Sequence, residues 1–303
     1  MSTNSVRNTE RNKNVLIGTK IRTKVRTKVC TTYSRYYLAR RARLTNLSRT
    51  SFFVLPIVLF FFLFLSASAA QANACTSQSF DKRAVVTQVY DGDTVKLANG
   101  DKIRLIGINT PEMNYKTGDP EPYAVKAKRF LEKRVLRKKI GIKYGRESKD
   151  RYKRTLAHVF LLDGTNLQYE ILKAGLAFNI SIPPNLGQQR CYRDAEGQAQ
   201  TKQIRVWKSP YFKPVNALKV NKHQVGFKRI SGKVSRVLET KKTIWIKFSE
   251  KMAIRISKKD LHYFKNFQPQ NLVGKQIKAK GWISLYKRRF SMRVKHPDAI
   301  SFK

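Results

Sequence analysis

Short runs of alternating apolar and polar residues predict several β-strands in the region that follows residue 83. The predicted strands cover residues 84–89, 94–97 and 102–108. The last two flank Asn99-Gly100-Asp101, the strongest local hairpin signal in the chain, because Asn-Gly turns match the twist of paired strands. Three short strands in succession favour a small β-barrel.

Helical periodicity follows between residues 121 and 136. Apolar side chains recur there every three or four positions with basic residues between them, which is typical of a helix packed on a core. Further along, the pattern predicts strands at 140–144 and 156–162, and helices at 167–174, ending at Gly175, and at 190–204, stopping near Trp207.

A second group of alternating strands occupies the C-terminal part. It comes after residues 209–224, a segment rich in Pro and Lys that we interpret as a linker. Strands are predicted at 228–238, 243–248, 253–256, 276–283 and 290–294, with a short helical segment at 258–267. Five strands and one helix favour a small barrel of the OB type, although a different small β-barrel would give the same pattern.

An uncharged stretch, residues 52–65, precedes all the predicted strands. Arginines lie before it and the small-residue run SASAAQANAC follows, with an Ala-x-Ala pattern at 67–69 or at 72–74. This arrangement favours a cleavable signal peptide and a secreted or periplasmic protein. The alternative is an uncleaved segment, residues 52–70, which is long enough to anchor the chain in a membrane.

Export changes the interpretation of the cysteines. After cleavage two would remain, Cys75 and Cys191, an even number in an oxidising compartment. A disulfide would tie the N-terminal strand to the region of the third predicted helix. Two unrelated thiols are the alternative.

Net charge narrows the range of functions. The chain contains 63 Lys and Arg against 19 Asp and Glu, a formal net charge of +44. So basic a surface favours polyanionic partners, nucleic acid or anionic membrane, and 41% hydrophobic residues exclude a wholly disordered basic tail. Most of the acidic residues lie between 71 and 212, and carboxylates are what hard metal ions and general bases require. We therefore expect catalytic chemistry in that middle segment.

Four separated motifs in the middle segment resemble the staphylococcal nuclease (thermonuclease) family. They are YDGDTVKL at 90–97, RLIGINTPE at 104–112, DRYKR at 150–154 and GLA at 175–177, in the order and strand context of that family. The resemblance covers about residues 84–208. It implies a mainly β fold with helices, an OB-type five-stranded barrel with three helices, which agrees with the strand pattern. It also implies a hydrolase of phosphodiester bonds in DNA or RNA, an endonuclease that leaves 3′-phosphate products.

The resemblance assigns roles to individual residues. Glu112 corresponds to the general base, and Arg104 and Arg154 to the catalytic arginines. Elementary chemistry agrees, because a guanidinium binds two phosphate oxygens in one plane and a carboxylate near activated water accepts its proton. The resemblance further implies one Ca²⁺ ion and contacts to nucleotide phosphate. The implied metal ligands are Asp93, Asn109 and Thr110, and the implied substrate-binding residues are Arg151 and Tyr152.

Two positions depart from the family pattern. The family usually has Asp where this chain has Asn109, so the metal site keeps an oxygen donor but loses a negative charge, which weakens metal binding. Residues 178–185 lack the tyrosines that in the family pack near the bound nucleotide, and Phe178 is the available substitute for stacking. His158 lies among apolar strand residues and is expected to be packed rather than catalytic.

The C-terminal domain is expected to bind nucleic acid, because basic and aromatic residues are interleaved in its strands. A merely basic, solvated surface is the alternative. The basic residues are Lys275, Lys278, Lys280, Lys287, Arg288, Arg289, Arg293 and Lys295, and the aromatic residues are Trp282, Tyr286 and Phe290. The predicted organisation is a basic segment (1–50), a signal-peptide region (51–74), a thermonuclease-like domain (75–208), a linker (209–224) and a basic OB-like domain (225–303).

These observations favour an exported, metal-dependent nuclease with an accessory nucleic-acid-binding domain. A catalytically weak or silent nucleic-acid-binding protein on the same fold is the alternative, which Asn109 favours and which Glu112 and the two arginines oppose. A third possibility is an envelope protein whose charge contacts anionic lipid. No obligate protein partner is evident from the sequence.

Overall fold

We describe a computed structural model of the chain, which covers residues 75–115 and 118–302. The predicted basic segment (1–50) and the signal-peptide region (51–74) lie outside the described residues. Within the described part, no helix has the length and apolar character needed to cross a membrane.

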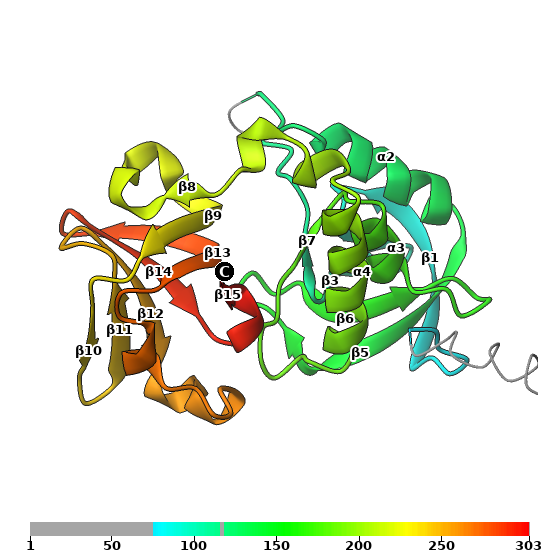
Figure 1. Cartoon of the computed structure of the whole chain (residues 1–303). Helices are drawn as coiled ribbons and strands as arrows, with labels where there is room; N and C mark the ends of the chain where they lie inside the picture. Colours follow the sequence, from blue (N-terminus) through cyan, green and yellow to red (C-terminus); the bar gives the residue numbers. More distant parts are fainter. Residues whose placement is uncertain (1–74, 116–117, 303) are drawn as a thin grey trace, which may run out of the picture. The chain divides into compact units, whose positions relative to one another are not determined.

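The first sheet is a closed barrel of five strands in the order β1-β2-β3-β6-β5 (Figure 1). The strands are β1 (Lys82–Val89), β2 (Thr94–Leu97), β3 (Lys102–Leu105), β5 (Lys139–Lys149) and β6 (Thr155–Phe160). β1 closes the barrel because its first half pairs with β5 and its second half with β2. β3 and β6 pair in parallel, and the other neighbours are antiparallel. This topology confirms the predicted OB-type barrel.

Three helices accompany the barrel, as predicted. They are α2 (Ala124–Val135), α3 (Leu167–Lys173) and α4 (Gln189–Thr201). The buried residues of α2 are Ala124, Ala127, Leu131 and Val135, whose spacing forms one apolar face against the barrel core. α2 begins later than the predicted residue 121, because Tyr123 has a left-handed φ of 71° that a helix cannot include.

The predicted strand 102–108 is divided in two by a turn. Gly107 has φ 81°, so β3 ends at Leu105 and a separate short strand, β4 (Ile108–Asn109), follows. β4 pairs with β7 (Phe178–Asn179) in a two-stranded antiparallel sheet. The break directs the residues after Ile108 away from the barrel wall, and these include the predicted metal ligands.

The C-terminal sheet repeats the connections of the first barrel. Its strands are β9 (Gly226–Lys233), β10 (Arg236–Glu239), β11 (Thr243–Lys247), β12 (Met252–Ser257), β13 (Gln276–Tyr286) and β14 (Arg289–Val294), with a short β15 (Ile300–Phe302) on β13. The order is β10-β11-β12-β14-β13-β9-β8, with β12 and β14 in parallel like β3 and β6. β9 and β10 are the halves of the predicted strand 228–238. The sheet closes through this bend, since Val234 N bonds to Lys275 O and Ser235 N to Lys247 O. The prediction of an OB-like second domain is thus supported by the strand order.

Short 3₁₀ helices replace the predicted C-terminal helical segment and occupy the predicted linker. The linker contains η3 (Pro210–Phe212), η4 (Ala217–Lys219) and η5 (Lys222–Gln224), and η6 (Lys258–Tyr263) replaces the helical segment. Three more lie elsewhere: η2 (Arg205–Trp207), η7 (Pro269–Leu272) and η8 (Pro297–Ala299). The linker segment also contains β8 (Val215–Asn216), which pairs with β9. Ala217 is buried in the second hydrophobic core, so part of this segment belongs to the C-terminal domain.

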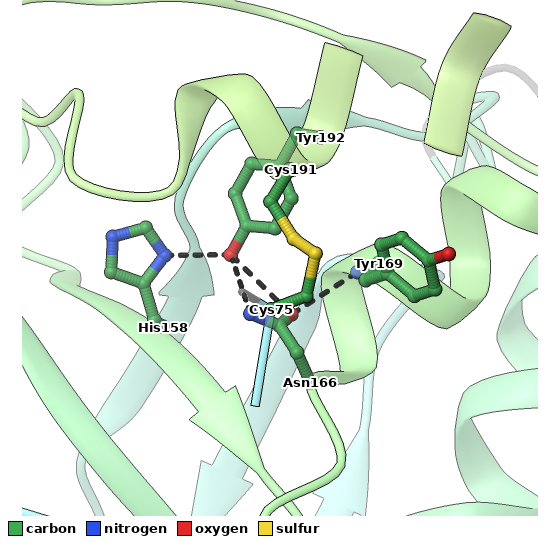
Figure 2. The surroundings of a disulfide bond; sticks show 6 residues. All are labelled: Cys75, His158, Asn166, Tyr169, Cys191 and Tyr192. Carbon is green, nitrogen blue, oxygen red and sulfur yellow. Dashed lines mark hydrogen bonds between the residues drawn. A yellow bond between two sulfur atoms is a disulfide. The ribbon is translucent and has the colours of Figure 1, made fainter. Parts of the chain in front are cut away.

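A disulfide joins Cys75 to Cys191 across 116 residues of chain, with a Cα–Cα distance of 5.6 Å. Figure 2 shows the bond beside Tyr192, whose hydroxyl lies 2.7 Å from His158 Nδ1 and also contacts Asn166. The predicted pairing is therefore present and ties the segment that precedes β1 to α4. His158 is 7% exposed and packed, as expected from its apolar neighbours.

Candidate active site

The motif Asp91-Gly92-Asp93 forms the turn between β1 and β2, and packing explains its glycine. A Cβ atom on Gly92 would lie 2.6 Å from the Cβ of Ala127 and 2.7 Å from Cγ2 of Thr110. Only glycine lets this turn lie against α2 and the segment after β4. The turn therefore brings both aspartates next to Thr110.

Asp93 is 5% exposed and links three elements of the barrel. Its Oδ2 accepts hydrogen bonds from the backbone nitrogen of Thr110 at 2.9 Å and from the hydroxyl at 3.0 Å. Its Oδ1 lies 3.1 Å from Nε of Arg104 on β3. Two of the predicted metal ligands, Asp93 and Thr110, are thus in direct contact.

Arg104 is held in place by the chain around it. Besides Asp93, it donates to the carbonyl oxygens of Leu105 at 2.6 Å and Ile108 at 2.9 Å, and to Oδ1 of Asn109 at 3.4 Å. A guanidinium has five N–H donors, so one NH1 hydrogen remains for a ligand once these contacts are made. The third predicted ligand, Asn109, is buried on β4 beside the other two.

Asp91 is a site residue that the sequence reasoning missed. It accepts a hydrogen bond from the backbone nitrogen of Asp93 at 2.9 Å. Desolvation by burial, followed by repulsion from Asp93, raises the pKa of Asp91 to about 7. The available signal is the pair of carboxylates two residues apart in the DGD motif, of which the resemblance assigns only Asp93 as a ligand.

Glu112 lies on the segment after β4, where Pro111 precedes it. Although the residue is exposed, desolvation of its carboxyl group and then repulsion from Asp93 raise its pKa, and the charge of Arg104 opposes the rise. Arg154 also acts on this carboxyl group. The predicted base, the two predicted arginines and Asp93 are therefore close enough for their charges to interact.

Arg154 is oriented by a neighbour that the sequence reasoning did not single out. Its Nε and NH2 each lie 2.7 Å from Oδ2 of Asp150, in the turn between β5 and β6. Burial of Asp150 opposes ionisation, but the hydrogen bonds and charge of Arg154 prevail and lower the pKa of Asp150. The DRYKR motif contained this residue, and its spacing to Arg154 was the signal.

The predicted substrate-binding residues lie in the same turn. Tyr152 is 63% exposed, and its ring is flanked by the guanidinium of Arg151 at 4.7 Å and that of Arg154 at 5.4 Å. Arg151 also donates to the Tyr152 hydroxyl at 2.7 Å. An exposed aromatic ring between two cations is suited to a nucleotide with its phosphate.

Oxygen atoms of the kind that a divalent cation binds are present on Asp91, Asp93, Asn109 and Thr110. In the described residues, no group of three or more His, Cys, Asp or Glu side chains is arranged to hold a metal ion. However, Asp91 and Glu112 both have pKa values raised by burial and by repulsion from Asp93. A bound cation would offset that repulsion. The residues that would hold a hard cation here are the two aspartates, with the neutral oxygens of Asn109 and Thr110.

Comparisons with known proteins agree with this geometry. Residues 102–209 match the family model described as staphylococcal nuclease homologue. The thermonuclease of Staphylococcus intermedius is 36% identical over 126 residues, which cover 41% of this chain and 74% of that protein. The thermonuclease of Staphylococcus hyicus is 32% identical over 158 residues, 51% of this chain and 92% of that protein. An uncharacterized endonuclease of Haemophilus influenzae is 31% identical over 158 residues, 51% of this chain and 77% of that protein. With its closed five-stranded barrel and these relatives, the chain belongs to the staphylococcal nuclease family.

Proposed function

We propose that this protein is an exported, metal-dependent nuclease that hydrolyses phosphodiester bonds of DNA or RNA. The observation that carries the proposal is the convergence of Glu112, Arg104, Arg154 and Asp93 at one place on the barrel, where their charges act on one another. Relatives named thermonuclease and endonuclease support the same chemistry.

Each side chain of the site has a separate role in the reaction. Glu112 removes a proton from the attacking water, and its raised pKa makes it a stronger base than an ordinary carboxylate. Arg154, held by Asp150, binds the phosphate and stabilises the negative charge that develops on it. Arg104 lies on β3 rather than in the turn that contains Arg154. It contributes its positive charge and its remaining N–H donor to binding of the phosphate.

Ca²⁺ is the proposed cofactor, because the available donors are carboxylate, amide and carbonyl oxygens. Asp93 and Asp91 would hold it, together with Asn109 and Thr110. A bound cation polarises a phosphate oxygen and so makes the phosphorus easier to attack.

Cleavage assays with both nucleic acids test this proposal. The purified protein is incubated with plasmid DNA or with RNA, in Ca²⁺ or in chelator, beside the Glu112→Gln variant. Cleavage that requires Ca²⁺ and is lost in the variant is expected. Binding without cleavage under all conditions would instead favour the catalytically silent alternative, in which Asn109 has removed the charge that the metal needs.

The C-terminal domain is proposed to provide accessory nucleic-acid binding through the β13–β14 hairpin. Tyr286 is 73% exposed and Lys287 lies over its ring at 5.6 Å. Arg288 and Arg289 follow, both exposed. In the shared strand order this turn corresponds to the turn between β5 and β6, which contains Arg151 and the exposed Tyr152. Two topologically equivalent turns thus present a tyrosine flanked by cations.

Salt dependence tests the hairpin. Changing Lys287 and Arg288 to Ser removes two cations, and each lost phosphate contact should reduce the slope of log K against log salt by about 0.9 on duplex DNA or about 0.7 on single strands. Changing Lys241 and Lys242 to Ser, in the exposed β10–β11 turn, is the matched control. Equal slopes in the two variants would mean that the hairpin does not contact nucleic acid.

Export is proposed from the signal-peptide pattern at residues 51–74, and the Cys75–Cys191 bond supports it, because disulfides persist in oxidising compartments. The N-terminal sequence of the mature protein, determined by mass spectrometry, tests this. A mature protein that begins at residue 1 and fractionates with membranes would favour the anchored alternative.

A further inference from the structure

The segment that carries Glu112 is an irregular connection between β4 and α2, and Glu121 fastens its two ends together. The backbone nitrogen of Glu121 donates to the carbonyl oxygen of Glu112 at 2.9 Å. In return, Oε2 of Glu121 accepts a hydrogen bond from the backbone nitrogen of Glu112, also at 2.9 Å. The main chain of the proposed base is therefore held on both its N–H and its C=O side by one residue.

The other carboxylate oxygen of Glu121 is bound by residues that follow the nuclease domain. Oε1 accepts a hydrogen bond from the hydroxyl of Tyr211 in η3 at 3.0 Å and lies 3.8 Å from Nζ of Lys228 on β9. Nζ of Lys228 also lies over the Tyr211 ring at 5.5 Å. The side chains of Glu121 and Lys228 are only 16% and 20% exposed, so water competes weakly for this ion pair, whereas Tyr211 is 51% exposed.

Two further contacts fix β9 and its neighbour β13 to the nuclease domain. Phe227, next to Lys228, packs on Phe178 of β7 with ring centroids 5.4 Å apart. Nζ of Lys280 on β13 pairs with the buried carboxylate of Glu196 on α4. Lys228 therefore lies on a strand that is itself held against the nuclease domain. This is needed if Lys228 is to keep Glu121 in one position.

We propose that Tyr211 and Lys228 act through Glu121 as positioning residues for the general base, so that the C-terminal region contributes to the chemical step as well as to binding. The proposal rests on the nuclease function assigned above. The three side chains form a latch that sets where the Glu112 backbone lies relative to the arginines. Because a displacement of about one ångström can reduce a rate by about 10²-fold, releasing the latch should lower kcat and leave KM nearly unchanged.

The test compares two lysines on the same strand in the full chain. Lys228→Met releases the latch, and Lys233→Met, at an exposed position on β9, removes the same charge as the control. Tyr211→Phe removes only the hydroxyl and keeps the ring on Phe212, whose centroid is 4.9 Å away. We expect kcat to fall about 10-fold or more in Lys228→Met and Tyr211→Phe, with KM within about twofold of wild type. Lys228→Arg, which keeps the cation, should restore most of the rate.

Amide hydrogen exchange at Glu112 provides a second measurement that does not need activity. Exchange should be faster in Lys228→Met than in Lys233→Met. If the wild-type protein cleaves neither DNA nor RNA, the nuclease proposal fails while the exchange measurement still decides whether the latch exists. Wild-type kcat in both latch variants, or an equal loss in Lys233→Met, would overturn the proposal.

Discussion

His158, a histidine buried in the neutral form, should by its own titration destabilise the nuclease domain as the pH falls below about 6.5. His158 on β6 is 7% exposed, and its Nδ1 lies 2.7 Å from the hydroxyl of Tyr192. Desolvation by burial, followed by repulsion from Lys143, lowers the pKa of His158 from 6.5 to about 4.

The sign and the size follow from these two pKa values. Between pH 6.5 and 4 the unfolded chain binds a proton at His158 that the folded protein does not, so acid favours unfolding. The contribution of His158 to the free energy of unfolding should fall by about 2 kcal/mol between pH 7.5 and pH 5, and by about 3 kcal/mol in total below pH 4. Asp91 acts in the opposite direction, since its pKa is raised on folding.

A variant isolates the contribution of His158 from that of other titrating groups. His158→Gln keeps a hydrogen-bonding partner for Tyr192 but carries no charge at any pH. Urea unfolding of the wild type and of the variant is followed at pH 7.5 and pH 5. On going from pH 7.5 to pH 5, the change in the free energy of unfolding should be about 2 kcal/mol more favourable in the variant than in the wild type. An equal change in the free energy of unfolding in the two proteins would refute the reasoning, since it would mean that His158 is protonated equally in the folded and unfolded states.

Three further substitutions have defined expected outcomes. Glu112→Gln should lower turnover by about 10² to 10⁴-fold with an unchanged far-ultraviolet circular dichroism spectrum, and wild-type rates would remove Glu112 from the mechanism. Asn109→Asp adds a charge beside Asp93 and should tighten Ca²⁺ binding in a calorimetric titration, whereas unchanged or weaker affinity would place residue 109 outside the metal shell. Replacing Cys75 and Cys191 by Ser opens a loop of 116 residues and should lower the free energy of unfolding by about 4 to 5 kcal/mol in urea, and an unchanged midpoint would contradict the role of the disulfide.

The sequence predicted the elements of the fold where local signals suffice. Alternation located the barrel strands within about three residues of their observed ends, except that β5 continues to Lys149, beyond the predicted end at 144. The errors come from backbone conformations that apolar periodicity does not encode. Tyr123 has a left-handed φ, so α2 begins only at Ala124. Gly107 divides one predicted strand into β3 and β4.

Long-range contacts explain what was missed in the site. Asp93, Arg104 and Glu112 could be predicted because each lies in a short contiguous motif of the family. By contrast, Tyr211 reaches Glu121 across 90 residues of chain, and nothing near either residue indicates that contact. Arg104 bonds to two backbone carbonyl groups and to buried Asp93. Arg104→Ala should therefore lower the stability of the barrel as well as the rate of cleavage.

The two barrels share one strand order, and the difference in their function lies in the loops. The connection from β1 to β2 contains Asp91 and Asp93, which concentrate negative charge where a cation and a base are needed. The equivalent connection from β10 to β11 contains Lys241 and Lys242 instead. Lysines there repel a divalent cation, and this connection of the second barrel lacks the acidic groups that would hold a metal ion. Because β9 also carries Lys228 of the latch, the barrel that lacks catalytic acids still influences the position of the base in the barrel that has them.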